Sequence, residues 1–226
     1  MPMQRRAFSM VAALITAAGG VAIASAVPAK PKAVHKAGPL QALEQHFRKA
    51  DADFKKGDRK AAAAEIREAA KLLRSEAGLA AAGAKRFLDP AAAELDKVAR
   101  RIGSVDEKTL RETFARAYHA LAAYEEWRAT EAWARKESVK AGTYLSAAAA
   151  QLERAGAWAE PKVNRAAAAA VKKARAVSQK LFKGSRLRRD EVSKAITGLR
   201  NQIKALGRKI GKAPERRAPV EQPRST

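Results

Sequence analysis

The stretch GSVDEKTLRETFARAYHALAAYEEWRATEAWARK, residues 103–136, predicts one long helix. Gly103 favours the end of a preceding element. Ser104 and Glu107 stand three positions apart, as in a capping box, where their side chains satisfy free backbone amides at a helix start. Apolar side chains then recur at steps of three and four, at Leu110, Phe114, Ala117, Leu121 and Tyr124. Because further aromatic residues surround this stripe, we expect a central helix, from about 105 to 136, with more than one packing neighbour.

Helices are also expected on both sides of this segment. Before it, three apolar stripes at helical spacing follow one another. Gly57 and Asp58 predict the turn between the first two, because Gly accepts a left-handed helix end and Asp caps the next start. Asp89 followed by Pro90 predicts the start of the third helix. After the central helix, the same spacing predicts helices over residues 138–157, 161–182 and 188–210.

The chain lacks any segment in which apolar and polar residues alternate as in a strand. We therefore predict an all-α protein, an elongated antiparallel bundle of about six or seven helices. Opposite charges four positions apart should support the central helix through three pairs, Glu107–Arg111, Glu112–Arg116 and Glu131–Arg135.

The N-terminal residues predict an export signal. Arg5 and Arg6 precede an uncharged stretch, residues 7–26, which ends in a small-x-small site. We expect a cleavable signal peptide over residues 1–26, cut between Ala26 and Val27, and a periplasmic or extracellular product. The Arg pair followed by Phe8 resembles a twin-arginine signal, and the general secretory route and an uncleaved anchor remain open.

Composition and charge divide the mature chain. Residues 27–39 are expected to form a flexible leader, residues 40–159 a helical bundle, residues 160–210 a basic hairpin packed on it, and residues 211–226 a disordered basic tail. Residues 27–159 contain 25 basic and 18 acidic side chains, a net charge of +7, whereas residues 160–226 contain 19 and 5, a net charge of +14. The excess of positive charge is therefore concentrated at the C-terminal end.

The basic hairpin is the candidate anion-binding surface. Its basic residues lie away from two apolar stripes at helical spacing: Lys162, Arg165, Lys172, Lys173, Lys180, Lys183, Arg188, Arg189, Lys194, Arg200, Lys204 and Arg208. A solvated face is the simpler interpretation. The functional interpretation is binding to an anionic envelope surface, a polyanion or an acidic protein, with at most peripheral membrane contact. Nucleic acid is an expected partner only if the signal is not used.

Catalytic chemistry has little support in the residues. The chain has no cysteine and three histidines, which lack the spacing of a metal site. The segment Gly78–Lys85 has a displaced lysine and no Ser or Thr after it, so it departs from a phosphate loop. We predict a non-enzymatic protein without cofactor or metal. A small-ligand carrier is the other hypothesis, with an aromatic pocket formed by Phe114, Tyr118, Tyr124 and Trp127.

The chain also repeats itself at a shift of 79 residues. The shift superposes Ile66 on Leu145 and Leu73 on Leu152, which suggests a duplicated helical hairpin module. Each copy contains one hairpin, with the pattern Gly57-Asp58-x-x-x-Ala62-x-x-x-Ile66-x-x-Ala69 in the first. This pattern resembles the second half of a tetratricopeptide unit, although Lys136 replaces the glycine in the second copy. The resemblance implies a helical interaction scaffold rather than an enzyme.

Overall fold

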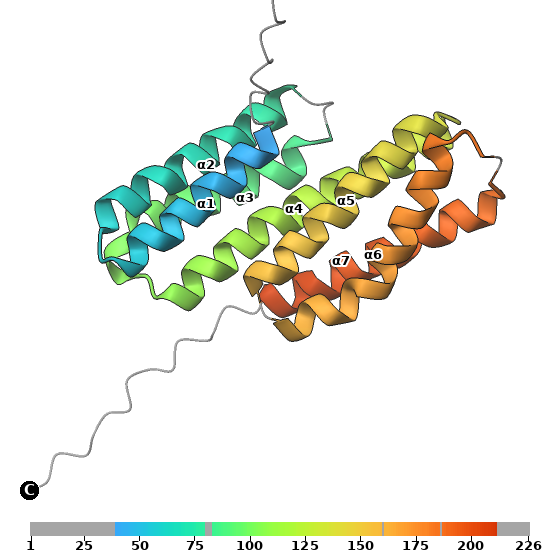
Figure 1. The fold of residues 1–226 in the computed structure, drawn as a ribbon. Helices are drawn as coiled ribbons and strands as arrows, with labels where there is room; N and C mark the ends of the chain where they lie inside the picture. Colours follow the sequence, from blue (N-terminus) through green and yellow to red (C-terminus); the bar gives the residue numbers. More distant parts are fainter. Residues whose placement is uncertain (1–38, 80–82, 160, 186, 212–226) are drawn as a thin grey trace, which may run out of the picture. The chain divides into compact units, whose positions relative to one another are not determined.

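The protein is described here from a computed structural model, which describes residues 39–79, 83–159, 161–185 and 187–211 (Figure 1). These residues form seven α-helices and one short 3-10 turn, with no strand among them. The predicted all-α helical bundle is therefore confirmed. The proposed signal peptide with its cleavage site, the leader up to residue 38 and the tail after Gly211 lie outside the described residues.

Short turns connect the helices in chain order. The helices are α1 (Pro39–Lys55), α2 (Arg59–Leu79), α3 (Lys85–Arg100), α4 (Glu107–Ala134), α5 (Ser138–Ala159), α6 (Pro161–Phe182) and α7 (Arg189–Ile210), with the 3-10 turn at Ile102–Ser104. In Figure 1, α2 lies beside both α1 and α3. Helix α4 contacts α1, α3, α5 and α7, which makes it the central helix of the described residues.

The start of α4 differs from the predicted capping box. The cap is Asp106, whose Oδ1 accepts a hydrogen bond from the Thr109 backbone N–H at 2.7 Å. Hydrogen bonding by Thr109, from its side chain and then from this N–H, lowers the pKa of the Asp106 carboxyl below its ordinary value. Ser104 instead ends the 3-10 turn, where its hydroxyl donates to the Arg101 carbonyl at 3.1 Å. The prediction of Ser104 as the cap was wrong because an acceptor stood closer to the first helical residue.

The start of α3 is also earlier than the sequence predicted. The helix begins at Lys85, and Pro90 lies inside it rather than at its first position. The Ala84 carbonyl accepts from the backbone N–H groups of Phe87 and Leu88, both at 3.0 Å. Pro90 is the sixth residue of α3, beyond the first turn, so it removes the backbone donor for the Arg86 carbonyl and its ring crowds that carbonyl. The helix nevertheless continues to Arg100.

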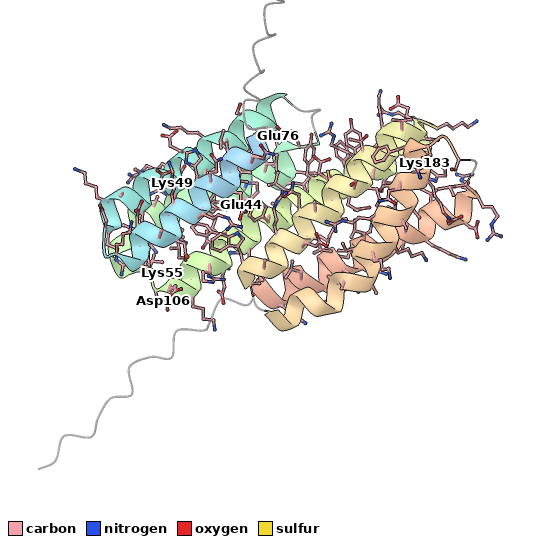
Figure 2. The ribbon with its side chains drawn as sticks, viewed as in Figure 1. Glu44, Lys49, Lys55, Glu76, Asp106 and Lys183 are labelled. Atoms are coloured by element: carbon pink, nitrogen blue, oxygen red, sulfur yellow. The ribbon has the colours of Figure 1, made fainter. Side chains whose placement is uncertain are left out.

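Two of the three expected ion pairs on α4 form, with Glu112–Arg116 at 3.9 Å and Glu131–Arg135 at 3.4 Å. The third, Glu107–Arg111, does not. Glu107 pairs with Lys55 at 3.2 Å, where α1 ends close to Asp106 (Figure 2). Arg111 lies 5.2 Å from the centre of the Trp158 ring on α5. Both side chains thus contact residues of other helices instead of each other.

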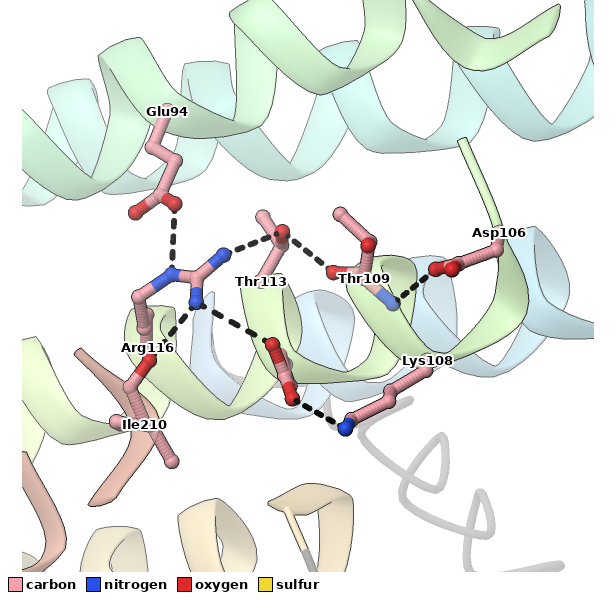
Figure 3. Close-up of polar contacts among 8 residues, drawn as sticks. Glu94, Asp106, Lys108, Thr109, Thr113, Arg116 and Ile210 are labelled. Carbon is pink, nitrogen blue, oxygen red and sulfur yellow. Dashed lines mark hydrogen bonds and ion pairs between the residues drawn. The ribbon is translucent and has the colours of Figure 1, made fainter. Parts of the chain in front are cut away.

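Arg116 of α4 joins this helix to α3 and α7 (Figure 3). Its Nε lies 2.6 Å from Glu94 Oε1 on α3, and its Nη1 donates to the Ile210 carbonyl at 3.0 Å. Its Nη2 donates to the Thr113 hydroxyl at 3.1 Å. Because Ile210 is the last residue of α7, this side chain satisfies one of the carbonyls that a helix end leaves without an intrahelical donor. It fixes the end of α7 beside α3 and α4.

The sequence repeat has a counterpart in the turns. Gly57, after α1, and Lys136, after α4, both have left-handed backbones, with φ of 85° and 63°. Their N–H groups donate to the carbonyls of Phe54 and Trp133, at 3.1 and 3.0 Å. The N–H of the following residue reaches back by five positions in each turn, to Asp53 and Ala132. Both turns therefore have the hydrogen bonds of a Schellman motif. Six of the seven pairs of apolar positions related by the shift are buried in both copies: Ala62, Ile66, Ala69, Leu73, Val98 and Ile102 in the first, and Ala141, Leu145, Ala148, Leu152, Val177 and Leu181 in the second. The seventh pair differs, because Phe54 is buried and Trp133 is half-buried.

Candidate anion-binding site

Acidic residues are scarce on the C-terminal helices. In the described residues of α6 and α7, the carboxylates are Asp190 and Glu191, both in the first turn of α7. Glu191 pairs with Lys180 at 2.9 Å. Asp190 lies 3.6 Å from Lys194 and 3.7 Å from Arg188. Three of the predicted anion-binding cations are therefore compensated locally.

Most of the other predicted cations are exposed. Within the described residues, six of them pair with no carboxylate: Lys172, Lys173, Lys183, Arg189, Lys204 and Arg208. Lys183 follows the end of α6 (Figure 2). Lys162 and Arg165 belong to the first turns of α6, and their side chains lie outside the described part of the structure. The described surface of the hairpin thus has an excess of uncompensated positive charge.

Three of the predicted basic residues differ from the others because they line a cleft. Arg200, Lys204 and Arg208 follow one another at four-residue steps along one flank of α7, and together they line a cleft of about 1030 Å³. Arg86 of α3 lines the same cleft. The cleft therefore receives positive charge from two helices that are far apart in the sequence.

The remaining lining of this cleft is largely apolar. It includes Phe87 of α3, Ala123 and Trp127 of α4, and Ile203 of α7. Gly207 brings α7 close to α4, because a Cβ at that position would lie 2.8 Å from His119 Nε2. The glycine thus permits α7 and α4 to approach each other closely where they line the cleft.

Arg200 and Glu126 form an ion pair in the cleft. Glu126 Oε1 accepts from Arg200 Nε at 3.0 Å and from Arg200 Nη2 at 2.7 Å. Thr130 Oγ1 lies 3.0 Å from the same carboxylate oxygen and 2.9 Å from Arg200 Nη2. Glu126 is only 7% exposed, so its charge is neutralised by Arg200. The net positive charge of the cleft therefore comes from Arg86, Lys204 and Arg208.

The Arg86 side chain lies over the aromatic part of the wall. Its guanidinium carbon is 4.7 Å from the centre of the Phe87 ring and 5.1 Å from that of Trp127. Gly83 makes room for Trp127, since a Cβ there would lie 2.4 Å from Cη2 of the indole. A guanidinium above an aromatic face is held by the ring quadrupole. Arg86 therefore combines a fixed position with a charge that no described carboxylate pairs with.

His119 contributes a neutral polar group to the wall. Burial lowers its pKa below the ordinary value, so the ring is uncharged at pH 7. Its Nε2 lies 3.0 Å from the Ile203 carbonyl and donates to it. His119 therefore links α4 to α7 without adding charge to the cleft.

The structure divides the four residues expected to form an aromatic pocket. Phe114 and Tyr118 are fully buried in the core, where Phe114 stacks on Phe47 with 4.3 Å between ring centres. The Tyr118 hydroxyl donates to Glu44, and burial raises its pKa. Tyr124 and Trp127 line a second cavity of about 340 Å³. That cavity also contains carboxylates and cations of α2, α4 and α5, so it has no excess of one charge.

Sequence reasoning missed Arg86, Phe87, His119, Ala123 and Glu126 as residues of the cleft. One signal was present on α7, where Gly207 and Gly211 stand four residues apart beside the cations. Small residues at helical spacing favour close approach of another helix. The partner helix could not be named from the sequence, because α3 and α4 meet α7 only through tertiary packing.

Within the described residues, no group of three or more His, Asp or Glu side chains is placed to hold a metal ion. None of the described helices has an apolar stretch that would reach across a bilayer. Comparison with known proteins found no matching family model, and no significant match among curated proteins or solved structures. The functional argument therefore rests on the residues of the chain itself.

Proposed function

We propose that this chain is an exported, non-enzymatic helical protein whose basic C-terminal helices bind an anionic partner. The observation that supports this most is that six of the cations predicted for the C-terminal hairpin are exposed and pair with no described carboxylate. Acidic residues on α1–α5 compensate many of the cations there, as the Arg74–Asp96 and Arg48–Glu44 pairs illustrate. The excess charge is thus local and available to a ligand.

The chemistry of such a surface favours a partner with many negative charges. Each basic residue near an anionic membrane contributes about 1 kcal/mol, and the attraction decays over a Debye length of ~8 Å at physiological salt. Several uncompensated cations on one hairpin are therefore sufficient for binding without a specific pocket. An anionic envelope surface, a polyanion and an acidic protein all satisfy this requirement.

Export rests on the sequence of residues 4–26. It determines which anion the protein meets, because an exported chain does not encounter the chromosome. The test is the mass and location of the mature product in its native cell. We expect a chain that begins at Val27 outside the cytoplasm. A full-length product bound to DNA in the cytosol would contradict export and favour sequence-independent nucleic-acid binding.

Binding is tested by co-sedimentation of the mature chain with phosphatidylglycerol vesicles and, separately, by its retention on polyphosphate, at rising salt. Deleting the hairpin would be a poor test, because Val192, Leu199 and Leu206 of α7 are buried in the core. The sharper variant reverses exposed charges at Lys172→Glu, Lys173→Glu and Lys183→Glu. The matched control reverses three exposed cations of α2 and α3, at Lys60→Glu, Lys97→Glu and Arg100→Glu.

We expect the hairpin variant to lose binding to both anions and the control to lose much less, although both change net charge equally. Binding of the wild type should weaken as salt rises. If the two variants lose binding to the same extent, total charge decides the affinity and the C-terminal helices are not the site. If neither loses binding, the proposed function is wrong.

A small-ligand carrier is the second candidate, and one observation favours it. The cleft beside α7 combines uncompensated cations with an apolar wall. A flat polyanion needs the cations but not that wall. The residues of this cleft replace the predicted four-residue aromatic set as the place to look for a ligand.

A further inference from the structure

The cleft between α3, α4 and α7 has two properties that a charged surface alone does not explain. It is open to solvent with a volume of about 1030 Å³, and it is lined by Phe87, Ala123, Trp127 and Ile203 as well as by basic residues. Ligand pockets in proteins occupy roughly 300–1,000 Å³ and are mainly apolar, with a few polar groups that orient the ligand. The cleft is slightly larger than this range.

The charges of the cleft are arranged unequally. Glu126 neutralises Arg200, so that pair contributes little net charge. Arg86, Lys204 and Arg208 are exposed and pair with no carboxylate of the described residues. The apolar side chains are less exposed than these cations, and Ile203 is only 4% exposed. The cations therefore lie toward the solvent and the apolar side chains toward the interior.

This arrangement discriminates between ligand classes. A small hydrophilic anion would leave the aromatic and aliphatic side chains exposed to water. It would therefore forgo the favourable free energy of burying them, roughly 25 cal/mol per Å² of apolar surface. A neutral apolar molecule would leave three cations without a partner. A bilayer surface or a polymer would meet the exposed cations but would not fill the interior of the cleft.

We propose that this cleft binds a free single-chain amphiphile with an anionic head group, the chain lying against Trp127 and Ile203 and the head group held by Arg86, Lys204 and Arg208. This inference deepens the proposed function and rests on it, because Lys204 and Arg208 belong to the basic C-terminal helices. Arg86 is fixed above Phe87 and Trp127, so its guanidinium is already positioned where the chain of the ligand would end. The head group is recognised by its charge, and a carboxylate, sulfate or phosphate ester satisfies the same donors.

Isothermal titration calorimetry with dodecanoate below its micelle concentration tests this directly. Dodecyl maltoside supplies the same chain without charge, and acetate supplies the charge without the chain. We expect saturable binding of one dodecanoate per protein, and affinities at least about tenfold weaker for the two partial ligands, because each lacks one set of contacts.

Two variants locate the site. Lys204→Glu with Arg208→Glu reverses charge at two exposed positions, and we expect dodecanoate affinity to fall by at least about tenfold. Ala123→Trp fills the apolar part of the cleft and should abolish binding. Lys60→Glu with Lys97→Glu makes the same charge change on α2 and α3, outside the cleft, and should leave dodecanoate binding unchanged. Far-ultraviolet circular dichroism checks that each variant folds. If Ala123→Trp does not fold, the variant Lys204→Glu with Arg208→Glu decides the result.

The outcomes separate this inference from the proposed function. Dodecyl maltoside or acetate binding as tightly as dodecanoate overturns the inference. So does an equal loss in the two double variants, or a failure of dodecanoate to bind while phosphatidylglycerol vesicles still do. That last result leaves the proposed function intact. Retained dodecanoate binding in a protein that binds neither vesicles nor polyphosphate would refute the proposed function and support the cleft alone.

Discussion

Glu125 is an acidic side chain of α4 with only 7% of its surface exposed. Its Oε1 lies 3.4 Å from Arg128 Nη1, and its buried Oε2 has no hydrogen-bond partner among the described residues. Burial raises the pKa of Glu125 to about 7, and the negative charge of Glu76 adds to the increase. The folded protein therefore holds a proton at Glu125 over a pH range in which the unfolded chain has released it.

Replacing Glu125 by Gln should change how stability depends on pH. Because the pKa is about 7 in the folded state and near 4.5 in the unfolded chain, the folded state binds more protons between these values, and stability falls as pH rises through them. The difference in free energy of unfolding between wild type and Glu125→Gln should therefore shift toward the variant by up to about 3 kcal/mol between pH 4 and pH 8.

Urea denaturation of both proteins across this pH range measures the effect. Glu131→Gln is the control, since Glu131 lies on the same helix with its side chain 46% exposed. A wild type that keeps the same advantage over Glu125→Gln at pH 4 and pH 8 would show that Glu125 titrates normally.

At the scale of the elements, α7 is held against α4 by the Glu126–Arg200 pair as well as by apolar packing. The carboxylate is almost fully buried, whereas the Arg200 side chain is 38% exposed. Removing one member of a buried pair leaves an uncompensated charge, while removing both members leaves none. Replacing both residues should therefore change the free energy of unfolding little, whereas replacing only one should lower it substantially.

Arg200→Met should lower the free energy of unfolding by about 2 kcal/mol, and Glu126→Gln combined with Arg200→Met should restore most of that loss. The control is Lys180→Met, which breaks the exposed pair with Glu191 between α6 and α7 and should cost less than about 1 kcal/mol. Chemical denaturation of the four proteins gives the comparison. A double variant less stable than Arg200→Met would contradict this account of the pair.

The two equivalent turns make a second prediction for the elements. Lys136 occupies the left-handed conformation that Gly57 occupies in the other turn. A residue with a Cβ is disfavoured there by about 1 kcal/mol, partly offset by the extra freedom of glycine in the unfolded chain. We expect Lys136→Gly to raise the free energy of unfolding by about 0.5 kcal/mol and Gly57→Lys to lower it by about 1 kcal/mol. Thermal unfolding monitored by circular dichroism would show both signs, and a stabilised Gly57→Lys would refute the equivalence of the turns.

The helices themselves could be predicted because their signals are local. Apolar spacing gave α5 and α6 nearly to the residue, and Gly57 with Asp58 marked the first turn, where Asp58 Oδ1 accepts from the Ala61 N–H at 2.8 Å. The exact caps were missed where two acceptors competed, as at Ser104 and Asp106. The cleft could not be predicted, because Arg86 meets the cations of α7 only after three helices have packed, and helical periodicity does not specify which helices become neighbours.

At the scale of the whole molecule, charge is distributed unevenly along the chain. The net charge of the full sequence is +23, and residues 160–226 contribute +14 against +7 for residues 27–159. Ion pairs within α1–α5 use many of the cations of that part, whereas the carboxylates described on α6 and α7 are confined to the first turn of α7. The part of the molecule that the structure describes is therefore most positively charged at its C-terminal helices rather than uniformly basic.

The most direct test of this claim is the acetylation rate of individual lysines, measured by mass spectrometry on the purified protein with and without phosphatidylglycerol vesicles. Lys172, Lys173, Lys183 and Lys204 are exposed on or beside the C-terminal helices, and Lys60 and Lys97 are exposed on α2 and α3. The account predicts that vesicles slow acetylation of the first group and leave the second unchanged. Equal protection of both groups, or protection of Lys60 and Lys97 alone, would contradict it.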